Sequence, residues 1–278
     1  MATLRAAGCV FAEEEAHMLV AAAQSPAQLA AMVERRARGL PLEHVIGWAE
    51  FCGLRVSVEA GVFVPRHRTE FLIECATPLA RRGAVVLDLC CGSGALGMAL
   101  AAALGDVELH ATDIDPAATK CARRNLAALG AHVYDGDLYA SLPAALRGRV
   151  TVILANVPYV PSTDIDMLPR EARIHESRTA LDGGADGLDI LRRVAAEAAG
   201  WLRPGGHLLV EATEQQAPAA AEIFTRHGLV AELRRSDELE ATVVTGMLPA
   251  ARGAAARGAS RRWSDASGAP AGGAAPRQ

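Results

Sequence analysis

Residues 84–104 constrain the fold of this chain more strongly than any other segment. The apolar stretch 84–89 has the composition of a buried strand, and it continues through Cys90-Cys91-Gly92-Ser93-Gly94 into an apolar helix at 95–104. Glycines in such a turn let the backbone approach a bound nucleotide closely, and they leave the N-terminus of the helix free to face it. This order of elements is typical of a doubly wound α/β fold.

An acidic residue follows at the end of the next predicted strand, 107–112. A carboxylate at Asp113 is placed to accept hydrogen bonds from both ribose hydroxyls of a nucleotide. Asp115 and Pro116 then begin a helix, with Asp as the N-cap and Pro in the first turn. Together with the glycine-rich turn, this arrangement predicts a cofactor that contains adenosine. The alternative is a doubly wound sheet that binds no ligand.

A second group of polar residues follows the predicted buried strand 150–155. Asn156-Val157-Pro158-Tyr159 comes directly after it, and in open α/β sheets ligands bind in the crevice beyond the carboxyl ends of the strands. The Asn156 side chain and the Val157 carbonyl offer two acceptors, and Tyr159 offers a flat face. This combination suits a planar –NH2 group. The alternative is an ordinary loop in which Pro158 sets a turn.

The identity of the cofactor depends on Asp88. Residues 92–97 match the G-x-G-x-x-G fingerprint of dinucleotide-binding domains, so a nicotinamide cofactor is one interpretation. However, Asp88 lies in the end of the strand before the turn, where a carboxylate would repel a pyrophosphate but could pair with an ammonium group. S-adenosylmethionine contains adenosine and a methionine ammonium and has no phosphate. It is therefore the predicted cofactor.

These segments resemble the motifs of a known enzyme family. Residues 88–94 are similar to motif I of class I S-adenosylmethionine-dependent methyltransferases, and 156–159 resemble the N-P-P-Y tetrad of those that methylate planar nitrogens. Three further segments resemble the protein (glutamine-N5) methyltransferases that modify peptide chain release factors: P-L-E-H-V-I-G through F at 41–51, V-P-R-H-R-T-E at 64–70 and A-L-D-G-G-A-D-G-L at 180–188. The resemblance covers roughly residues 40–246.

The residues and the resemblance together give a predicted site. Catalysis is expected from the tetrad Asn156, Val157, Pro158 and Tyr159. The expected cofactor-binding residues are Asp88, Cys90, Gly92, Ser93, Gly94, Asp113, Asp137, Leu138 and Asn156. The resemblance places Asp137 and Leu138 at the edge and face of the adenine. It also implies a substrate-side position for Arg66, Thr69 and Glu70.

Some positions depart from the family's motifs. Val157 stands where the family has Pro, Cys90 replaces the first Gly of motif I, and Ser177 stands where a Pro is expected. Val157 keeps its carbonyl, so amide recognition is expected to survive, and Cys90 is expected to be tolerated if its backbone avoids a conformation that only glycine adopts. The region before Pro41 is shorter than the family's N-terminal helical domain, which helps to engage the release factor. The sequence therefore leaves the substrate open.

Four regions are expected along the chain. Residues 1–48 are predicted to form a short N-terminal helical domain for substrate recognition, with two helices between 11 and 38, and 49–65 a β-hairpin linker. Residues 66–250 are the predicted methyltransferase domain, and 251–278 a disordered tail rich in Ala, Gly and Arg. The predicted fold is α/β, with a doubly wound, mostly parallel seven-stranded sheet. Its strands are expected at 84–89, 107–112, 131–134, 150–155 and 206–211, with Pro204-Gly205-Gly206 as a turn and a closing antiparallel pair at 230–234 and 241–246.

Composition indicates the cellular location of the protein and the kinds of partner it can bind. The formal net charge is −4, and the tail's five Arg and one Asp give +4, so residues 1–250 carry −8. Such a body is poorly suited to tracking a nucleic-acid backbone. No apolar stretch reaches the ~20 residues of a membrane span, and neither the six Cys nor the eight His show the spacing of a disulfide framework or a metal site. We expect a cytoplasmic enzyme without a metal, a membrane contact or direct nucleic-acid binding; the sequence leaves the oligomeric state open.

The favoured function is N-methylation of the side-chain amide of a protein glutamine, as in a class 1 peptide chain release factor. An amide nitrogen is a poor nucleophile because its lone pair is delocalised into the carbonyl, and two acceptors on its N–H groups localise that electron density. One alternative is an N-methyltransferase of a nucleic-acid base or a small metabolite. Others are a nicotinamide-dependent oxidoreductase and a cofactor-binding module without catalysis.

Overall fold

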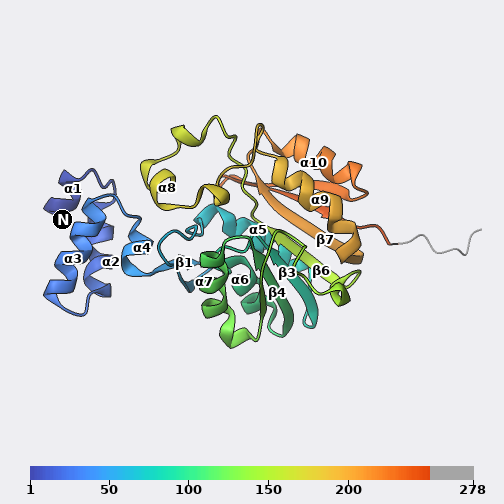
Figure 1. Cartoon of the computed structure of the whole chain (residues 1–278), viewed down its shortest axis with the longest axis horizontal. Helices are drawn as coiled ribbons and strands as arrows, with labels where there is room; N and C mark the ends of the chain where they lie inside the picture. Colours follow the sequence, from blue (N-terminus) through green and yellow to red (C-terminus); the bar gives the residue numbers. More distant parts are fainter. Residues whose placement is uncertain (251–278) are drawn as a thin grey trace, which may run out of the picture.

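The computed structural model describes residues 1–250, so the predicted disordered tail at 251–278 lies outside the described residues. The first helices form a small bundle at one end of the molecule (Figure 1): α1 (Ala2–Ala6), α2 (Ala12–Ala22), α3 (Pro26–Ala37) and α4 (Leu42–Ile46). The helices α2 and α3 confirm the two that were predicted. The helices α1 and α4 were not predicted, because five residues are too few to show a helical period.

A two-stranded hairpin connects this bundle to the main domain, in the region 49–65 where a hairpin was predicted, but its second strand already ends at Ser57. Strands β1 (Trp48–Phe51) and β2 (Leu54–Ser57) pair antiparallel. The turn between them consists of Cys52 and Gly53, whose φ angles of 50° and 70° lie in the left-handed region that a two-residue hairpin turn requires. Phe51 is fully buried and packs into the core of the main domain.

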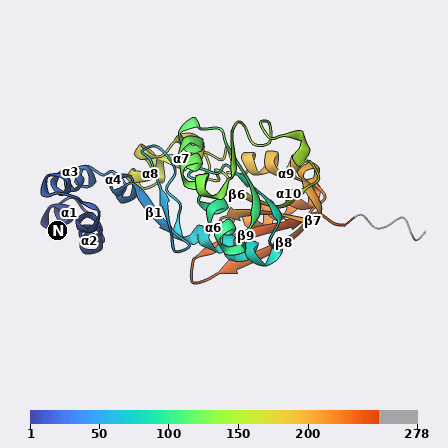
Figure 2. The same ribbon diagram turned by 90° about the horizontal axis from the view of Figure 1, so that it is seen from below.

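A seven-stranded sheet with the order β5-β4-β3-β6-β7-β9-β8 forms the centre of the main domain (Figure 2). Strand β9 pairs antiparallel with both β7 and β8, and the other pairings in this sheet are parallel, so the mostly parallel sheet with its closing antiparallel pair is confirmed. The strands are β3 (Ala84–Leu89), β4 (Val107–Asp113), β5 (His132–Asp135), β6 (Val150–Ala155), β7 (Leu202–Ala212), β8 (Val230–Ser236) and β9 (Ala241–Met247).

The strand β7 begins earlier than predicted. The stretch 204–206, expected as a turn before the strand, lies inside it, where the pairing register with β6 shifts between Val150 and Val152. Gly206 sits at this irregularity, and a Cβ there would come within 2.8 Å of the Val150 carbonyl oxygen. A glycine-rich bulge therefore replaces the expected turn.

Helices cover both faces of the sheet. Alternate residues of β3 show why: Leu87 and Leu89 belong to one buried cluster and Val86 to the other, as the two-residue period of a strand requires. The first cluster contains residues of α9 and α10, and the second contains residues of α5, α6 and α7. These helices and the short α8 are α5 (Glu70–Ala76), α6 (Ala95–Leu104), α7 (Pro116–Leu126), α8 (Arg170–His175), α9 (Asp189–Trp201) and α10 (Ala217–Arg226).

The strand order reverses between β3 and β6, and this position defines where a ligand can bind. Helices that follow the two strands leave on opposite faces of a doubly wound sheet, so a crevice opens beyond the carboxyl ends of the strands at this point. The glycine-rich turn follows β3 and the tetrad follows β6, so the two motifs predicted to form the site meet at this edge. Within residues 1–250, no helix combines the length and the apolar character needed to cross a bilayer.

Candidate active site

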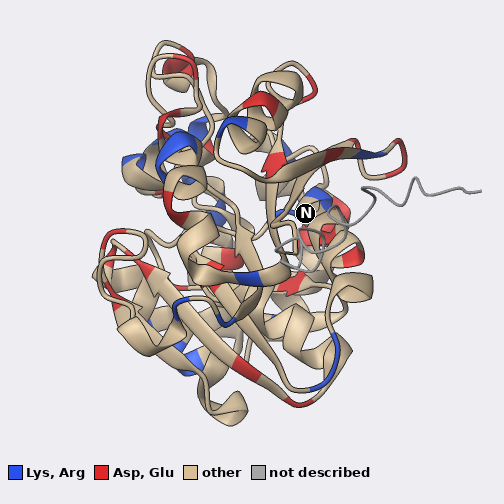
Figure 3. Cartoon of the chain, turned by 90° about the vertical axis from the view of Figure 1, so that its right-hand side faces the viewer, with Lys and Arg blue, Asp and Glu red and all other residues tan. Residues whose placement is uncertain are grey.

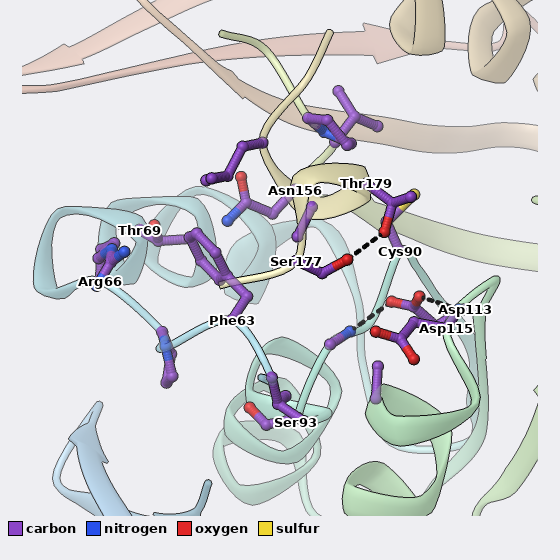
Figure 4. A pocket seen from close by; sticks show the side chains of 18 of the residues that line it. Phe63, Arg66, Thr69, Cys90, Ser93, Asp113, Asp115, Asn156, Ser177 and Thr179 are labelled. Carbon is purple, nitrogen blue, oxygen red and sulfur yellow. Dashed lines mark hydrogen bonds between the residues drawn. The ribbon is translucent and has the colours of Figure 1, made fainter. Parts of the chain in front are cut away.

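A cavity of about 650 Å³ lies at this edge of the sheet. Its walls include the turn after β3, the end of β4, the tetrad after β6 and the loop 168–181. In Figure 4, Asn156 and Thr69 lie on the opposite side of the view from Asp113 and Asp115, with Ser177 between them. A second cavity of about 430 Å³ shares wall residues with the first and adds Asp137 and Leu138, so the two form one continuous cleft.

The predicted glycines of the turn serve different purposes. Gly92 has a φ angle of 54°, lines the cavity, and has open space where a Cβ would stand, so its lack of a side chain leaves room for a ligand. Gly94, expected to bind the cofactor, is not among the residues that line the cavities. A Cβ at Gly94 would lie 3.0 Å from the Leu126 side chain, and its φ angle is 80°. Glycine at 94 therefore suits both the left-handed backbone at this position and the close packing of α6 against α7.

Cys90 adopts a φ angle of 53°, in the left-handed region that favours glycine. This region is accessible to other residues at a cost of about 1–2 kcal/mol. The substitution of the family's glycine by Cys90 is therefore tolerated but strained. Burial raises the pKa of the Cys90 thiol, so the side chain presents a neutral sulfur to the cleft.

Asp113 shapes the turn as well as facing the cleft. One carboxylate oxygen accepts a hydrogen bond from Gly92 N at 2.9 Å, and the other accepts one from Asp115 N at 2.9 Å. Burial raises the pKa of Asp113. The Asp115 side chain caps α7 by accepting a hydrogen bond from Ala117 N, as predicted. The free lone pairs of Asp113 remain available for two hydroxyl groups in the cleft.

Asp88 lies behind the turn and does not line either cavity. It is fully buried, and its Oδ2 atom accepts a hydrogen bond from Gly97 N, in the first turn of α6, at 2.8 Å. Its Oδ1 atom has no partner among the described residues. Burial raises the pKa of Asp88 to about 8. Asp88 therefore supports the start of α6, and the direct contact with an ammonium group expected from the sequence stays a prediction.

Asn156 presents an unused acceptor at the cavity. Its Oδ1 atom is buried and has no hydrogen-bond partner among the described residues. The Val157 carbonyl likewise receives no hydrogen bond from residues 1–250, and the Val157 side chain is buried. A buried acceptor without a donor costs about 1–3 kcal/mol. These two acceptors are therefore free to bind a ligand that carries N–H groups.

The Tyr159 hydroxyl is bound by two residues that the sequence did not single out. Arg68 donates a hydrogen bond to it, and the hydroxyl donates to Glu211 Oε1 at 3.3 Å. Burial, together with the Glu211 carboxylate, raises the pKa of Tyr159 to about 12. Tyr159, which was expected to offer a flat face to a planar –NH2 group, lines the cavity as a neutral phenol.

The remaining predicted residues fall into two groups. Asp137 forms an ion pair with Arg193 at 2.6 Å, and the buried Leu138 lies beside it in the second cavity with a φ angle of 50°. On the other side of the cleft, Arg66 and Thr69 line the first cavity, whereas Glu70 does not and instead accepts a hydrogen bond from Cys52 N at 2.8 Å.

Arg66 is already engaged within the protein. Its guanidinium lies 2.6 Å from an oxygen of Glu176, whose side chain is 1% exposed, and Glu176 also accepts a hydrogen bond from Val64 N. Arg66 therefore fixes the loop that contains Ser177 against the segment before α5. Ser177, in place of the expected Pro, bonds to the Thr179 hydroxyl at 2.7 Å. Both hydroxyls face the cleft (Figure 4).

These residues fit S-adenosylmethionine. Gly92 leaves room for close approach, Asp113 offers acceptors for the ribose hydroxyls, and the second cavity offers the apolar Leu138 and Ile114 for an adenine ring. The tetrad then borders the place where the methionine end of the cofactor would lie. A sheet of this strand order with this cleft defines a class I S-adenosylmethionine-dependent methyltransferase.

Comparisons with known proteins agree with this class. The family model for a methyltransferase small domain matches residues 53–187. A methyltransferase from Pyrococcus furiosus has the same fold, with a TM-score of 0.54 and 16% identity over 71% of this chain and 90% of that one.

Curated relatives define the family more closely. A release factor glutamine methyltransferase from Geobacter sulfurreducens is 40% identical over 73% of this chain and 72% of its own length. One from Mycolicibacterium smegmatis is 37% identical over 82% and 86%. The chain belongs to the family of release factor glutamine methyltransferases.

Proposed function

We propose that this enzyme transfers the methyl group of S-adenosylmethionine to the side-chain amide nitrogen of a glutamine in a protein, and that the acceptor is a peptide chain release factor in the cytoplasm. The observation that carries the proposal is the buried, unpartnered Oδ1 atom of Asn156 at the cavity. A primary amide supplies the N–H donors that Asn156 and the Val157 carbonyl lack. The names of the relatives support glutamine and a release factor as the acceptor.

The protein's own groups act on the acceptor nitrogen. When bound, the cofactor supplies a methyl group on a positively charged sulfur. Asn156 and Val157 accept hydrogen bonds from the two N–H groups, localise electron density on the nitrogen, and stabilise the positive charge that develops there. Pro158 fixes the backbone between these acceptors and Tyr159. The rest of the acceleration comes from in-line positioning of nitrogen and methyl group.

The charge distribution favours a protein acceptor over a nucleic acid. Residues 1–250 carry a formal charge of −8, because the tail's +4 is part of a whole-chain charge of −4. In the view of Figure 3, blue and red segments are interspersed, and no continuous basic stripe runs across this side of the ribbon. Affinity for a phosphate backbone depends on such a stripe.

The test is methyl transfer from radiolabelled S-adenosylmethionine to a purified release factor, with tRNA, rRNA and DNA as competing acceptors. Label should appear on the release factor and map to a glutamine by mass spectrometry. Label on a nucleic acid instead would overturn the proposal.

The variant Asn156→Ala tests whether the free acceptor of Asn156 is needed for methyl transfer. We expect turnover to fall by at least ~100-fold, the loss seen when one preorganised polar group is removed. Cofactor affinity, measured by calorimetry, should remain close to that of the wild type. The matched control is Gln215→Ala, which removes an exposed amide away from the cavities and should leave turnover unchanged. Wild-type turnover in Asn156→Ala would remove Asn156 from the mechanism.

A further inference from the structure

We infer that Arg68 and Glu211 are positioning residues that hold the Tyr159 ring as a fixed wall of the acceptor site. The inference rests on the proposed function, because it concerns how that site is shaped. Neither residue was singled out by the sequence, and they lie 143 positions apart in the chain. Arg68 belongs to the short 3₁₀ helix before α5, and Glu211 lies near the end of β7.

Three interactions close a triangle around the hydroxyl of Tyr159. Arg68 Nε donates to Glu211 Oε1 at 2.9 Å, an Arg68 Nη2 N–H donates to the Tyr159 hydroxyl, and that hydroxyl donates to Glu211 Oε1 at 3.3 Å. The Arg68 guanidinium carbon also lies 5.9 Å from the centroid of the Tyr159 ring. The hydroxyl thus accepts from the cation and donates to the carboxylate, which requires that it keep its proton.

Because Glu211 is buried, its carboxylate needs a cationic partner. The Glu211 side chain is 5% exposed, and its second oxygen has no partner among the described residues, so Arg68 is the cation that balances its charge. A buried carboxylate without such a partner is strongly disfavoured. Arg68 is therefore held in place by Glu211, and Tyr159 is held by both.

The backbone of Tyr159 is fixed independently of its hydroxyl. Its carbonyl accepts a hydrogen bond from Gln216 Nε2 at 2.9 Å. A Cβ at Gly187 would overlap this same carbonyl, and a Cβ at Gly183 would lie 2.7 Å from the Pro158 carbonyl oxygen. The segment 158–159 thus packs directly on the glycines of the loop before α9.

Fixing both ends of Tyr159 matters because the acceptor amide must lie in one plane beside the methyl group. A displacement of about 1 Å from the reacting geometry can cost on the order of 100-fold in rate. A ring that is free to swing would enlarge the site and allow the amide to tilt. Arg68 and Glu211 therefore act on turnover through Tyr159, without contributing to cofactor affinity.

A double-mutant cycle separates this role from a direct contact with the acceptor. Arg68→Met keeps the length of the side chain and removes its donors, and Tyr159→Phe removes only the hydroxyl. Each single variant should lower kcat by about 10- to 100-fold, with the KM for S-adenosylmethionine unchanged. The double variant should be no slower than Tyr159→Phe alone, because both changes break the same link. An equal loss from Arg68→Met in both backgrounds would overturn the inference.

Two further variants guard against an unfolding artefact. Glu211→Gln keeps the shape of the side chain without its charge, and the cycle with Tyr159→Phe should be non-additive for it as well. Arg68→Lys restores one cationic donor and should recover part of kcat. Arg226→Met, which removes an exposed Arg on α10, is the matched control and should change nothing.

A spectroscopic measurement tests the link without catalysis. The chain has three tyrosines, so ring-¹³C-labelled tyrosine gives few signals, and Tyr159→Phe identifies that of Tyr159. In Arg68→Met this signal should show increased ring motion, while those of Tyr134 and Tyr139 stay as in the wild type. An unchanged Tyr159 signal would overturn the inference. If the wild type does not methylate glutamine, the proposed function fails, but this measurement still decides whether Arg68 holds Tyr159.

Discussion

At the scale of single residues, Asp88 gives the protein a distinct dependence of stability on pH. Its pKa is raised to about 8 in the folded protein by burial, above the 3.8 of an ordinary Asp. Between about pH 4 and pH 8 the folded state therefore binds more protons than the unfolded state, and stability falls as the pH rises. Asp88→Asn should remove this loss, a difference on the order of a few kcal/mol.

Thermal unfolding from pH 5 to pH 9 checks this expectation. The stability of Asp88→Asn should rise relative to the wild type as the pH increases, while the exposed Asp106→Asn should follow the wild type throughout. Parallel curves for Asp88→Asn and the wild type would mean that Asp88 is ionised in the folded protein. Its cofactor affinity, measured on the same protein, distinguishes support of α6 from the ammonium contact expected from the sequence.

Residues whose role depends on local chain geometry were predictable, and those that act through distant partners were not. Asn156 and Gly92 each stand at the end of a recognisable strand, so their place at the cavity follows from the rules of open α/β sheets. No sequence motif relates Arg68 to Glu211, because only folding brings the two residues together. Gly94 belongs to the same motif, but its positive φ angle and its close contact with Leu126 could not be predicted from the motif.

At the scale of elements, the loop before α9 is the support on which the tetrad rests. Gly187 has a φ angle of 76°, and a Cβ there would overlap the Tyr159 carbonyl. Gly187→Ala should therefore lower both the melting temperature and kcat, because the substitution adds a steric conflict to backbone strain.

Gly205→Ala is the matched control for this variant. Its φ angle of 74° is nearly the same, but a Cβ at Gly205 meets nothing within 4 Å, so the substitution introduces strain alone. Backbone strain should lower the free energy of unfolding of each variant by about 1 kcal/mol. Only Gly187→Ala should also lower turnover. Equal losses of stability and activity in both would show that the contact with Tyr159 is unimportant.

Elements with a continuous apolar pattern were predicted more accurately than short elements without one. Runs such as 84–89 and 150–155 are bounded by turn residues and rich in β-branched side chains, so their limits agree with β3 and β6. The helix α8 has six residues and no periodic pattern, yet Glu171 and Ala172 from it line the cavity. Short elements of this kind are defined by the surrounding packing, which the local sequence does not encode.

At the scale of the whole molecule, one buried arginine connects the N-terminal bundle to the cavity wall. Arg36 on α3 bonds both oxygens of Glu15, and it also reaches Glu171 of α8 at 2.6 Å. In Figures 1 and 2, α8 lies between the bundle and the sheet. The predicted substrate-recognition domain is thus tied directly to α8, which contributes Glu171 and Ala172 to the cavity wall.

Glu171→Gln should weaken this tie without unfolding the bundle. Because the Glu171 side chain is 45% exposed, we expect a loss of stability below about 1 kcal/mol. The KM for the protein acceptor should rise severalfold, with the KM for S-adenosylmethionine unchanged. Glu34→Gln, which breaks an exposed pair with Arg38 at the C-terminal end of α3, is the control. An unchanged acceptor KM would show that the orientation of the bundle does not affect acceptor binding.

The fold class, the sheet topology and the family follow from motifs spread over most of the chain, and all are confirmed. The attachment of the bundle does not follow from them, because it depends on tertiary contacts, among them that of Arg36 with Glu171, 135 positions away, and that of His44 with the Val62 carbonyl. The assignment of residues 1–48 to substrate recognition stays a prediction, which the Glu171→Gln measurement addresses.

The pair of acceptors at Asn156 and Val157 also explains why the enzyme would methylate each amide nitrogen only once. A primary amide satisfies both acceptors. The secondary amide left after one transfer has a single N–H hydrogen, so one of the two oxygens again lacks a donor, which weakens binding by about 1–3 kcal/mol. The modified chain is thereby expelled in favour of fresh acceptor, and exhaustive incubation should add one mass increment of 14 Da, never two.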